Sequence, residues 1–310
     1  MARNLKYQFL NAIEKNFNEG MDKHSLKRTE GLGSGRIFSY ADRKNLIDFS
    51  CNFAKYIKEN YSNVKLARDI KVEHIQAFLN SKATSCSKAT LVQYKSKFNK
   101  LETLVNKTYG SKVNYSKGYV VPITKENTAK IRCAAMSKND YSKLCNAMKD
   151  SKSSAVIAVQ FAGRFGLRVS ETTKLQGRDI DLQKGVLRVV DSKGKRSREI
   201  SIPDKHRAFL QCVRASVGDT QRIVPIQPNS VNKAVRRGLE KAGSSSRLDN
   251  NYKDAKTGIH SIRKMAAQNH FNECRSAGLS IKDSLSSTSI FLGHGANRYE
   301  LMKEYVENIK

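Results

Sequence analysis

Apolar residues recur at helical spacing along most of the chain and alternate at strand spacing in only one stretch, residues 179–202. The helical pattern predicts helices over residues 40–60, 72–79, 90–105, 141–148, 155–165, 230–241, 260–274 and 301–306. Short strands are expected over 179–181, 186–190 and 198–202, with a Gly194 turn between the last two, as in a hairpin. The chain is therefore predicted to be mainly α, with one small antiparallel β-sheet.

Changes in composition divide these 310 residues into four parts. Residues 1–36 are predicted to form a basic N-terminal extension, and residues 37–120 a small all-helical domain. A polar stretch follows, with a linker over 121–136, and the second domain, over 137–310, contains the predicted sheet.

The charge of the chain identifies the kind of partner. Lys and Arg number 57 against 28 Asp and Glu, a formal net charge of +29. The excess is +12 in residues 1–120 and +17 in the remainder, so it is not confined to a tail. A field of this sign attracts nucleic acid, with an affinity that falls as salt rises. An apolar content of 39% favours packed cores over a histone-like or ribosomal chain.

Other classes of protein have weaker support. No run of about 18 apolar residues is present, so a cytoplasmic, nucleoid-associated protein without membrane contact is expected. Six scattered cysteines form no CxxC pair, which disfavours a zinc site. We therefore expect no metal and no cofactor.

Lysines accompany aromatic residues in the helix predicted over 90–105. Lys95, Lys97 and Lys100 lie near Tyr94 and Phe98, as expected of a helix that contacts DNA phosphates. A solvated helix face would carry the same residues, and the sequence leaves both interpretations open.

Four short segments carry residues suited to phosphate chemistry. They are Gly166-Leu167-Arg168-Val169-Ser170-Glu171, the hairpin tip with Lys193, His260-Ser261-Ile262-Arg263, and the stretch from Leu292-Gly293-His294 to Tyr305. The three-residue spacing of His260 and Arg263 places both side chains on one face of a helix. Each segment alone is common in unrelated proteins, so the order of all four is the informative feature.

In this order the segments resemble the tyrosine recombinase, or phage integrase, family. The resemblance extends over nearly the whole chain and includes the stretches Ala67-Arg68-Asp69-Ile70, His74-Ile75-Gln76-Ala77-Phe78-Leu79, Lys88-Ala89-Thr90-Leu91, Ser192-Lys193-Gly194 and Arg198-Glu199-Ile200. It implies a two-domain DNA clamp, in which residues 37–120 are the core-binding domain and residues 137–310 the catalytic domain.

The resemblance also implies a role for each residue. Tyr305 would attack a phosphodiester and form a 3′-phosphotyrosine, which requires a leaving-group acid and cations around the phosphorane. Arg168 and Arg263 would hold the non-bridging oxygens, and Lys193 would protonate the departing 5′ oxygen. His260 would accept the tyrosine proton, and His294 would donate a hydrogen bond to the phosphate. Further expectations are a positioning role for Glu171 and DNA contacts for Lys195 and Arg196.

Three of these assignments have competitors nearby. His294 and Tyr305 are eleven residues apart, a longer spacing than is typical of the family, and Tyr299 lies between them. Tyr305 is preferred because Val306 follows it, as at the family's C-terminal motif. Arg164 competes with Arg168, and Lys195 competes with Lys193.

The expected function is site-specific recombination of mobile DNA by integration or excision, through a Holliday junction, without ATP or metal. Four protomers on two specific duplex sites would form the synapse, with an accessory directionality factor as a further partner; chromosome-dimer resolution would use the same chemistry. Only five residues follow Tyr305, so residues 1–30 or 243–257 are expected to connect protomers. The alternatives are a type IB topoisomerase, a catalytically silent DNA-binding protein and a metal-dependent nuclease.

Overall fold

The computed structural model describes residues 4–19, 29, 35–124, 135–190, 197–243, 258–307 and 309. The chain divides into two compact units, residues 1–130 and 131–310, which we call the N-terminal and C-terminal units. The division falls inside the predicted linker. Lys193, Lys195 and Arg196 lie outside the described residues, as do most of residues 243–257.

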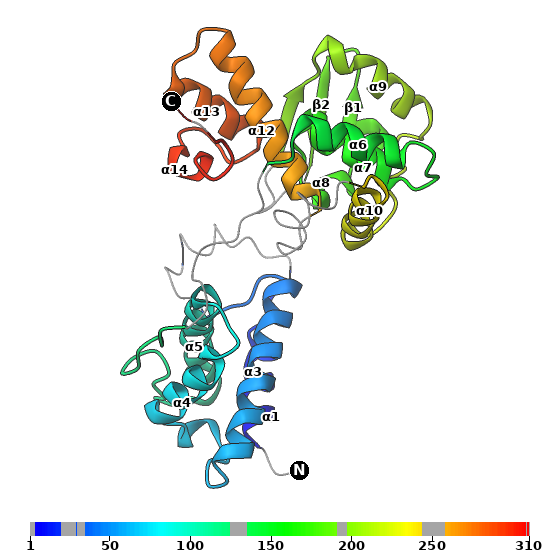
Figure 1. Cartoon of the computed structure of the whole chain (residues 1–310). Coiled ribbons are helices and arrows are strands. Elements are labelled where there is room, and N and C mark those ends of the chain that lie inside the picture. Colours follow the sequence, from blue (N-terminus) through cyan, green and yellow to red (C-terminus); the bar gives the residue numbers. More distant parts are fainter. Residues whose placement is uncertain are drawn as a thin grey trace. The chain divides into compact units, whose positions relative to one another are not determined.

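The regular elements in the described part of the N-terminal unit are helices, and one isolated β-bridge joins Phe17 to Ile37 (Figure 1). Its elements are α1 (Leu5–Lys15), α3 (Tyr40–Asn60), a 3₁₀ turn (Ala67–Asp69), α4 (Val72–Ala83) and α5 (Lys88–Tyr109). Ser39 and Ser87 cap α3 and α5, because each side chain accepts a hydrogen bond from a backbone N–H of the first turn. The core is rich in aromatic residues: Phe53 packs against Phe9, Phe78 and Phe98.

The predicted extension over residues 1–36 is not separate from this unit. Helix α1 buries Leu5, Phe9, Ala12 and Ile13 in the same core as α3 and α5, and it runs beside α3 (Figure 1). The apolar spacing of α1 is that of an amphipathic helix, which must cover its apolar face. Residues 5–15 are therefore part of the domain, and they are not a free arm.

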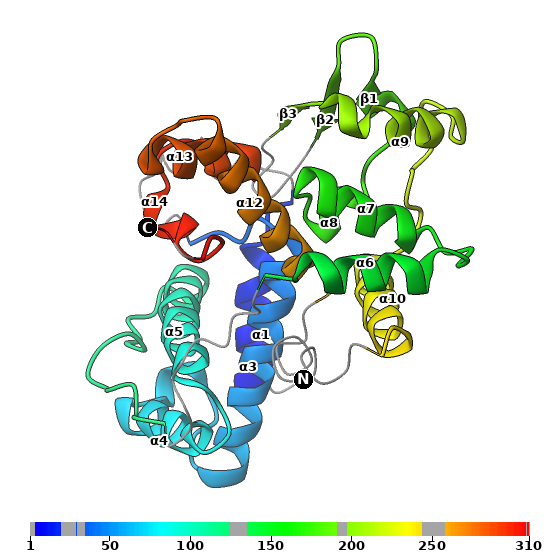
Figure 2. The same ribbon diagram turned by 45° about the horizontal axis from the view of Figure 1, so that its top comes forward.

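The C-terminal unit contains the sheet and the remaining helices (Figure 2). Its helices are α6 (Lys138–Met148), α7 (Ala155–Phe165), α8 (Val169–Thr172), a 3₁₀ turn (Gly177–Asp179), α9 (Asp204–Ala215), α10 (Pro228–Lys241), α12 (Ile259–Ser276), α13 (Ile281–Phe291) and α14 (Tyr299–Met302). The strands β1 (Ile180–Asp181), β2 (Val186–Val189) and β3 (Arg198–Ser201) form an antiparallel sheet in the order β1-β2-β3, with Val189 opposite Arg198. The mainly α fold with a small antiparallel sheet is confirmed.

Two apolar clusters build this unit. The larger one joins α6, α7, α10, the sheet and the start of α12. The smaller one contains Ala267, Phe271, Leu285, Met302 and Tyr305, and joins α12 to α13, α14 and the C-terminal segment. Helix α12 thus belongs to both clusters, and its N-terminal half brings His260 and Arg263 to their junction.

Candidate active site

A tight turn between α7 and α8 presents Arg168. Helix α7 ends at Gly166, which has a positive φ of 59°, and a Cβ there would lie 2.8 Å from the Phe291 ring. Both constraints require glycine at this position. Glu171, in the first turn of α8, then accepts a hydrogen bond from the backbone N–H of Arg168 at 2.8 Å. This bond satisfies an N–H at the helix start and fixes the carboxylate beside its own arginine.

Glu171 is the buried centre of a cluster of arginines. Its side chain is 1% exposed, and its carboxylate accepts hydrogen bonds from Arg168 at 2.7 Å and from Arg198 at 3.0 and 3.1 Å. The Arg263 guanidinium approaches to 3.8 Å. One carboxylate cannot neutralise three guanidinium groups, so the cluster keeps a net positive charge suited to a phosphate.

Arg263 is held entirely inside the domain. It is 1% exposed and donates hydrogen bonds to the carbonyl oxygens of Gly166 and, at 2.6 Å, of Leu292. Burial lowers the pKa of this guanidinium to about 10, and the neighbouring Arg168 acts in the same direction. The group nevertheless stays protonated at neutral pH, and its position is fixed by backbone atoms of two separate segments.

His294 lies between two arginines. Its Nε2 is 3.1 Å from Nη2 of Arg168 and 3.4 Å from Nη2 of Arg263. Burial, followed by the charges of Arg168 and Arg263, lowers the pKa of the imidazole to about 4, so the ring is neutral at pH 7. Guanidinium groups can only donate, so Nε2 accepts and the ring proton is assigned to Nδ1.

This arrangement bears on the hydrogen bond predicted from His294 to the phosphate, which stays a prediction. Because Nε2 accepts from the two arginines, Nδ1–H is the ring donor left for that bond. The same Nε2 contacts fix the direction of both guanidinium groups.

The Tyr305 ring lies against the same residues. Its centroid is 5.7 Å from that of His260 and 5.4 Å from that of His294, and Cζ of Arg263 lies 5.8 Å from it. The side chain is 9% exposed, and Tyr305 follows α14 in a turn closed by a hydrogen bond to Met302. Residues of the His260–Arg263 motif and of the Gly293–His294 motif therefore converge on this tyrosine.

The competing residues lie elsewhere. The Tyr299 hydroxyl donates to Oδ1 of Asn297 at 2.6 Å, and its ring is near Lys282. Arg164 donates to Gln160 at 3.0 Å, lies 3.1 Å from His206 and stacks over Phe209. Tyr299 packs against the apolar cluster that contains Tyr305, but its hydroxyl is engaged by Asn297, and Arg164 is engaged by Gln160, His206 and Phe209.

Arg198 is the member of the cluster that was not predicted from the sequence. It begins β3 and reaches Glu171, which lies 27 residues earlier in the chain. A cation next to a hairpin ordinarily faces solvent, and the sequence gives no sign of so distant a partner. The signals in the sequence were its place five residues after Lys193 and the resemblance of the stretch Arg198-Glu199-Ile200 to the family.

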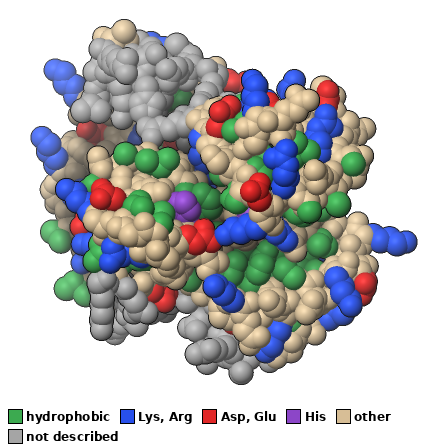
Figure 3. All heavy atoms as spheres, turned by 90° about the horizontal axis from the view of Figure 1, so that it is seen from above, with side chains coloured by type: hydrophobic (Ala, Val, Ile, Leu, Met, Phe, Trp, Pro, Cys, Tyr) green, Lys and Arg blue, Asp and Glu red, His purple; other side chains and the backbone are tan. Residues whose placement is uncertain are grey.

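The predicted DNA-binding lysines of the N-terminal unit have different environments. Lys95 is exposed, whereas Nζ of Lys97 lies 5.5 Å from the ring centroids of Phe49 and Tyr94. Nζ of Lys100 is 2.5 Å from Oδ2 of Asp42, so its charge is already paired. In a space-filling view, Lys and Arg side chains are spread over the visible face (Figure 3).

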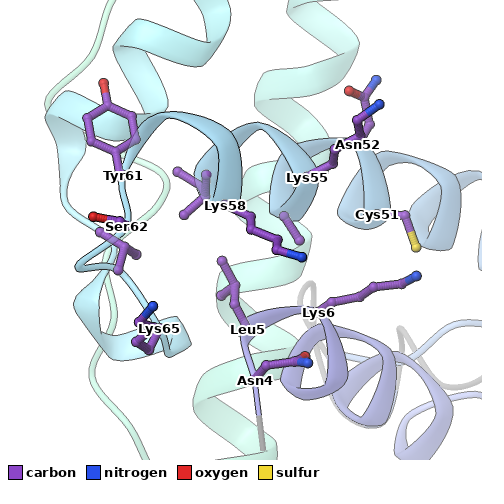
Figure 4. Close-up of a pocket in the computed structure, with 13 residues that line it drawn as sticks. Asn4, Leu5, Lys6, Cys51, Asn52, Lys55, Lys58, Tyr61, Ser62 and Lys65 are labelled. Atoms are coloured by element: carbon purple, nitrogen blue, oxygen red, sulfur yellow. The ribbon is translucent and has the colours of Figure 1, made fainter.

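The N-terminal unit also has a groove of about 880 Å³ between α1 and α3. Lys6 and Lys58 extend into it from the two helices, and Leu5 lines it (Figure 4). None of the predicted DNA-binding lysines and none of the residues around Tyr305 line this groove.

Two further searches concern metals and membranes. Among the described residues, no group of three or more His, Cys, Asp or Glu is arranged to hold a metal ion. In the same part of the chain, no helix is both long and apolar enough to cross a bilayer.

Comparisons with solved structures give the same fold. The XerH site-specific recombinase bound to a palindromic difH substrate, in a post-cleavage complex, matches with a TM-score of 0.61 and 16% identity, over 98% of this chain and 90% of that one. A lambda integrase dimer bound to a COC′ core site matches with a TM-score of 0.58 and 18% identity, over 92% of this chain and 77% of that one. A lambda integrase tetramer bound to a Holliday junction gives 0.56 and 18%, over 92% and 77%.

The fold is thus the one seen in solved tyrosine recombinases. Residues 134–276 match the profile of the phage integrase family, the family that the order of the motifs predicted. No curated protein sequence matches the chain. The matched region contains Arg168, His260 and Arg263 but ends before His294 and Tyr305. The structure places these last two residues next to Arg263.

Proposed function

We propose that this chain is a site-specific DNA recombinase that cuts and rejoins duplex DNA through a covalent bond between Tyr305 and a 3′ phosphate. The observation that carries the proposal is the convergence of Arg263, His260 and His294 on the Tyr305 ring, with Arg168 bound to His294. These four residues come from three separate segments of the C-terminal unit, and each is of a type that phosphoryl transfer without a resident metal requires.

Cleavage would proceed by an in-line displacement. The Tyr305 oxygen attacks phosphorus, its proton passes to His260, and the bond from phosphorus to the 5′ oxygen breaks. Arg168 and Arg263 bind the two non-bridging oxygens and stabilise the charge that develops on them. Lys193, on the hairpin before β3, supplies the proton for the departing 5′ oxygen.

Rejoining is the same step in reverse. One ester replaces another of similar energy, so no nucleotide cofactor is consumed. A 5′ hydroxyl from a second duplex attacks the phosphotyrosine, and the exchange of two strands leaves a Holliday junction. The proposal includes a tetramer on two recombination sites, in which the described part of α1 is not a connecting element because its apolar face is buried.

The proposal is tested by trapping the covalent intermediate. The full chain is incubated in excess chelator with nicked duplexes that cover its native flanking DNA, and the reaction is stopped with SDS. We expect a protein–DNA adduct at one sequence with chelator present. Adducts spread over unrelated sequences, with plasmid relaxation, would support a type IB topoisomerase instead. Specific binding without an adduct would support a silent DNA-binding protein.

The N-terminal unit is proposed to bind the DNA backbone through α5. Lys95→Ala or Lys97→Ala should weaken binding at every sequence and reduce the slope of log K against log salt by about 0.9 per lost phosphate contact. Lys100→Ala should reduce the slope by less, because Lys100 is already paired with Asp42. If the wild type and the three lysine variants gave equal slopes in a filter-binding titration, these lysines would lie on a solvated helix face that makes no DNA contact.

A further inference from the structure

Arg198 makes a bidentate contact with the buried carboxylate of Glu171. Its Nη1 donates to Oε1 at 3.0 Å and its Nη2 to Oε2 at 3.1 Å, so both carboxylate oxygens are engaged by one planar group. The Arg198 side chain is only 13% exposed. A bidentate pair of this kind fixes the orientation of the carboxylate as well as its position.

The same guanidinium lies against the turn that carries His294. Gly293 has a positive φ of 70°, and a Cβ on it would lie 2.7 Å from Nη1 of Arg198 and 2.9 Å from its Cζ. Any side chain at Gly293 would therefore displace the arginine. Arg198 thus contacts both the Arg168–Glu171 motif and the Gly293–His294 motif, and it begins the strand that follows the Lys193 hairpin.

The charges of the cluster indicate what this contact achieves. Because Arg198 contacts both carboxylate oxygens, it offsets part of the negative charge that Glu171 presents to Arg168. Nη2 of Arg168 is directed at His294. Without Arg198, the full carboxylate charge would act on Arg168 and on Arg263, 3.8 Å away, in a site of low exposure where such interactions are strong. Those two arginines would then stabilise a bound phosphate less.

We propose that Arg198 is a positioning residue for strand cleavage, acting through Glu171 to keep Arg168 and Arg263 oriented and available to the phosphate. The inference rests on the proposed recombinase function. Arg198 itself is not required to touch the DNA, and its action depends on the carboxylate that it holds.

The test is a double-mutant cycle in the full chain. Arg198→Ala should slow single-turnover cleavage of a nicked duplex by about 10- to 100-fold, and Arg198→Lys should restore little because an ammonium lacks the planar fork. In a Glu171→Gln background, the same Arg198→Ala change should have an effect of less than about threefold, because the charge it controls is gone. The affinity for the specific DNA site should change by less than about threefold in both single Arg198 variants, in Glu171→Gln and in the double variant.

Arg188→Ala is the matched control. Arg188 lies on β2 of the same sheet and pairs with Asp181 at 2.7 Å and Glu199 at 3.4 Å. Its loss removes comparable ion pairs without touching Glu171, so cleavage should stay within about twofold of the wild type. A slow Arg188→Ala would mean that general weakening of the sheet explains the Arg198 effect, which would overturn the proposal.

Two measurements separate this inference from the proposed function. Additive effects of Arg198→Ala and Glu171→Gln on cleavage, or wild-type cleavage by Arg198→Ala, would overturn the inference while the adduct at Tyr305 remained. A wild-type protein that forms no adduct would overturn the proposed function. In that case urea unfolding of the wild type, Arg198→Ala, Glu171→Gln and the double variant still measures the Arg198–Glu171 coupling. Additive changes in the free energy of unfolding would show that the two side chains do not interact.

Discussion

Tyr305→Phe is expected to abolish the covalent protein–DNA complex, with a loss of roughly 10⁴-fold or more, because no other group replaces the attacking oxygen. The substitution removes only the hydroxyl. The ring should keep its place in the cluster of Ala267, Phe271 and Met302, so the variant should fold and bind its site normally. The measurement is the SDS-resistant adduct on a nicked duplex, with binding followed by gel shift.

Tyr299→Phe is the control for this experiment. The Tyr299 hydroxyl is bonded to Asn297, away from His260 and His294, so its removal should leave the adduct at the wild-type level. If the adduct survives in Tyr305→Phe and disappears in Tyr299→Phe, the nucleophile has been misassigned. The site geometry would then need a rearrangement of the segment after His294.

Lys193→Ala should slow cleavage of an ordinary phosphodiester by about 100- to 10,000-fold, the usual contribution of a general acid. A substrate with sulfur in place of the bridging 5′ oxygen should restore most of the rate, since a thiolate leaves without a proton. The rate of adduct formation is measured for each variant on both substrates.

Lys195→Ala separates the two lysines of the hairpin. We expect it to weaken DNA binding through one lost phosphate contact and to leave the ratio of rates on the two substrates unchanged. Rescue of Lys195→Ala by sulfur, with no rescue of Lys193→Ala, would transfer the acid role to Lys195.

Apolar alternation and helical spacing in the sequence predicted the elements that are determined over a short range. The hairpin was predicted because apolar alternation and a central glycine specify strands and a turn over a short range. His260 and Arg263 were predicted to share a helix face from their spacing alone, and both contact Tyr305 in the structure. The order of the motifs predicted the family, which the profile match confirms.

Helix α13 was not predicted, for a physical reason. Its sequence is rich in serine and threonine, which are typical of loops in a single sequence. In the structure Ser284, Thr288 and Ser289 are fully buried, and the hydroxyls of Thr288 and Ser289 find backbone acceptors, whereas Ser284 Oγ has no hydrogen-bond partner among the described residues. Thr288 donates to the carbonyl of Ser284 at 2.7 Å, and Ser289 to that of Gly295 at 2.5 Å. Such pairing is decided by tertiary structure and leaves no period in the sequence.

The burial of Arg263 has a consequence for how members of such a family can lose activity. The two carbonyl oxygens that it binds belong to Gly166 and Leu292, the residues that end α7 and α13, where both helix dipoles are negative. The cation thus joins two helix ends inside the domain, and its loss would leave both carbonyl oxygens without this partner whether or not the protein cleaves DNA. An intact Arg263 is therefore weak evidence of an active enzyme, whereas the Tyr305 hydroxyl, which the fold does not need, is where a silent descendant would first differ.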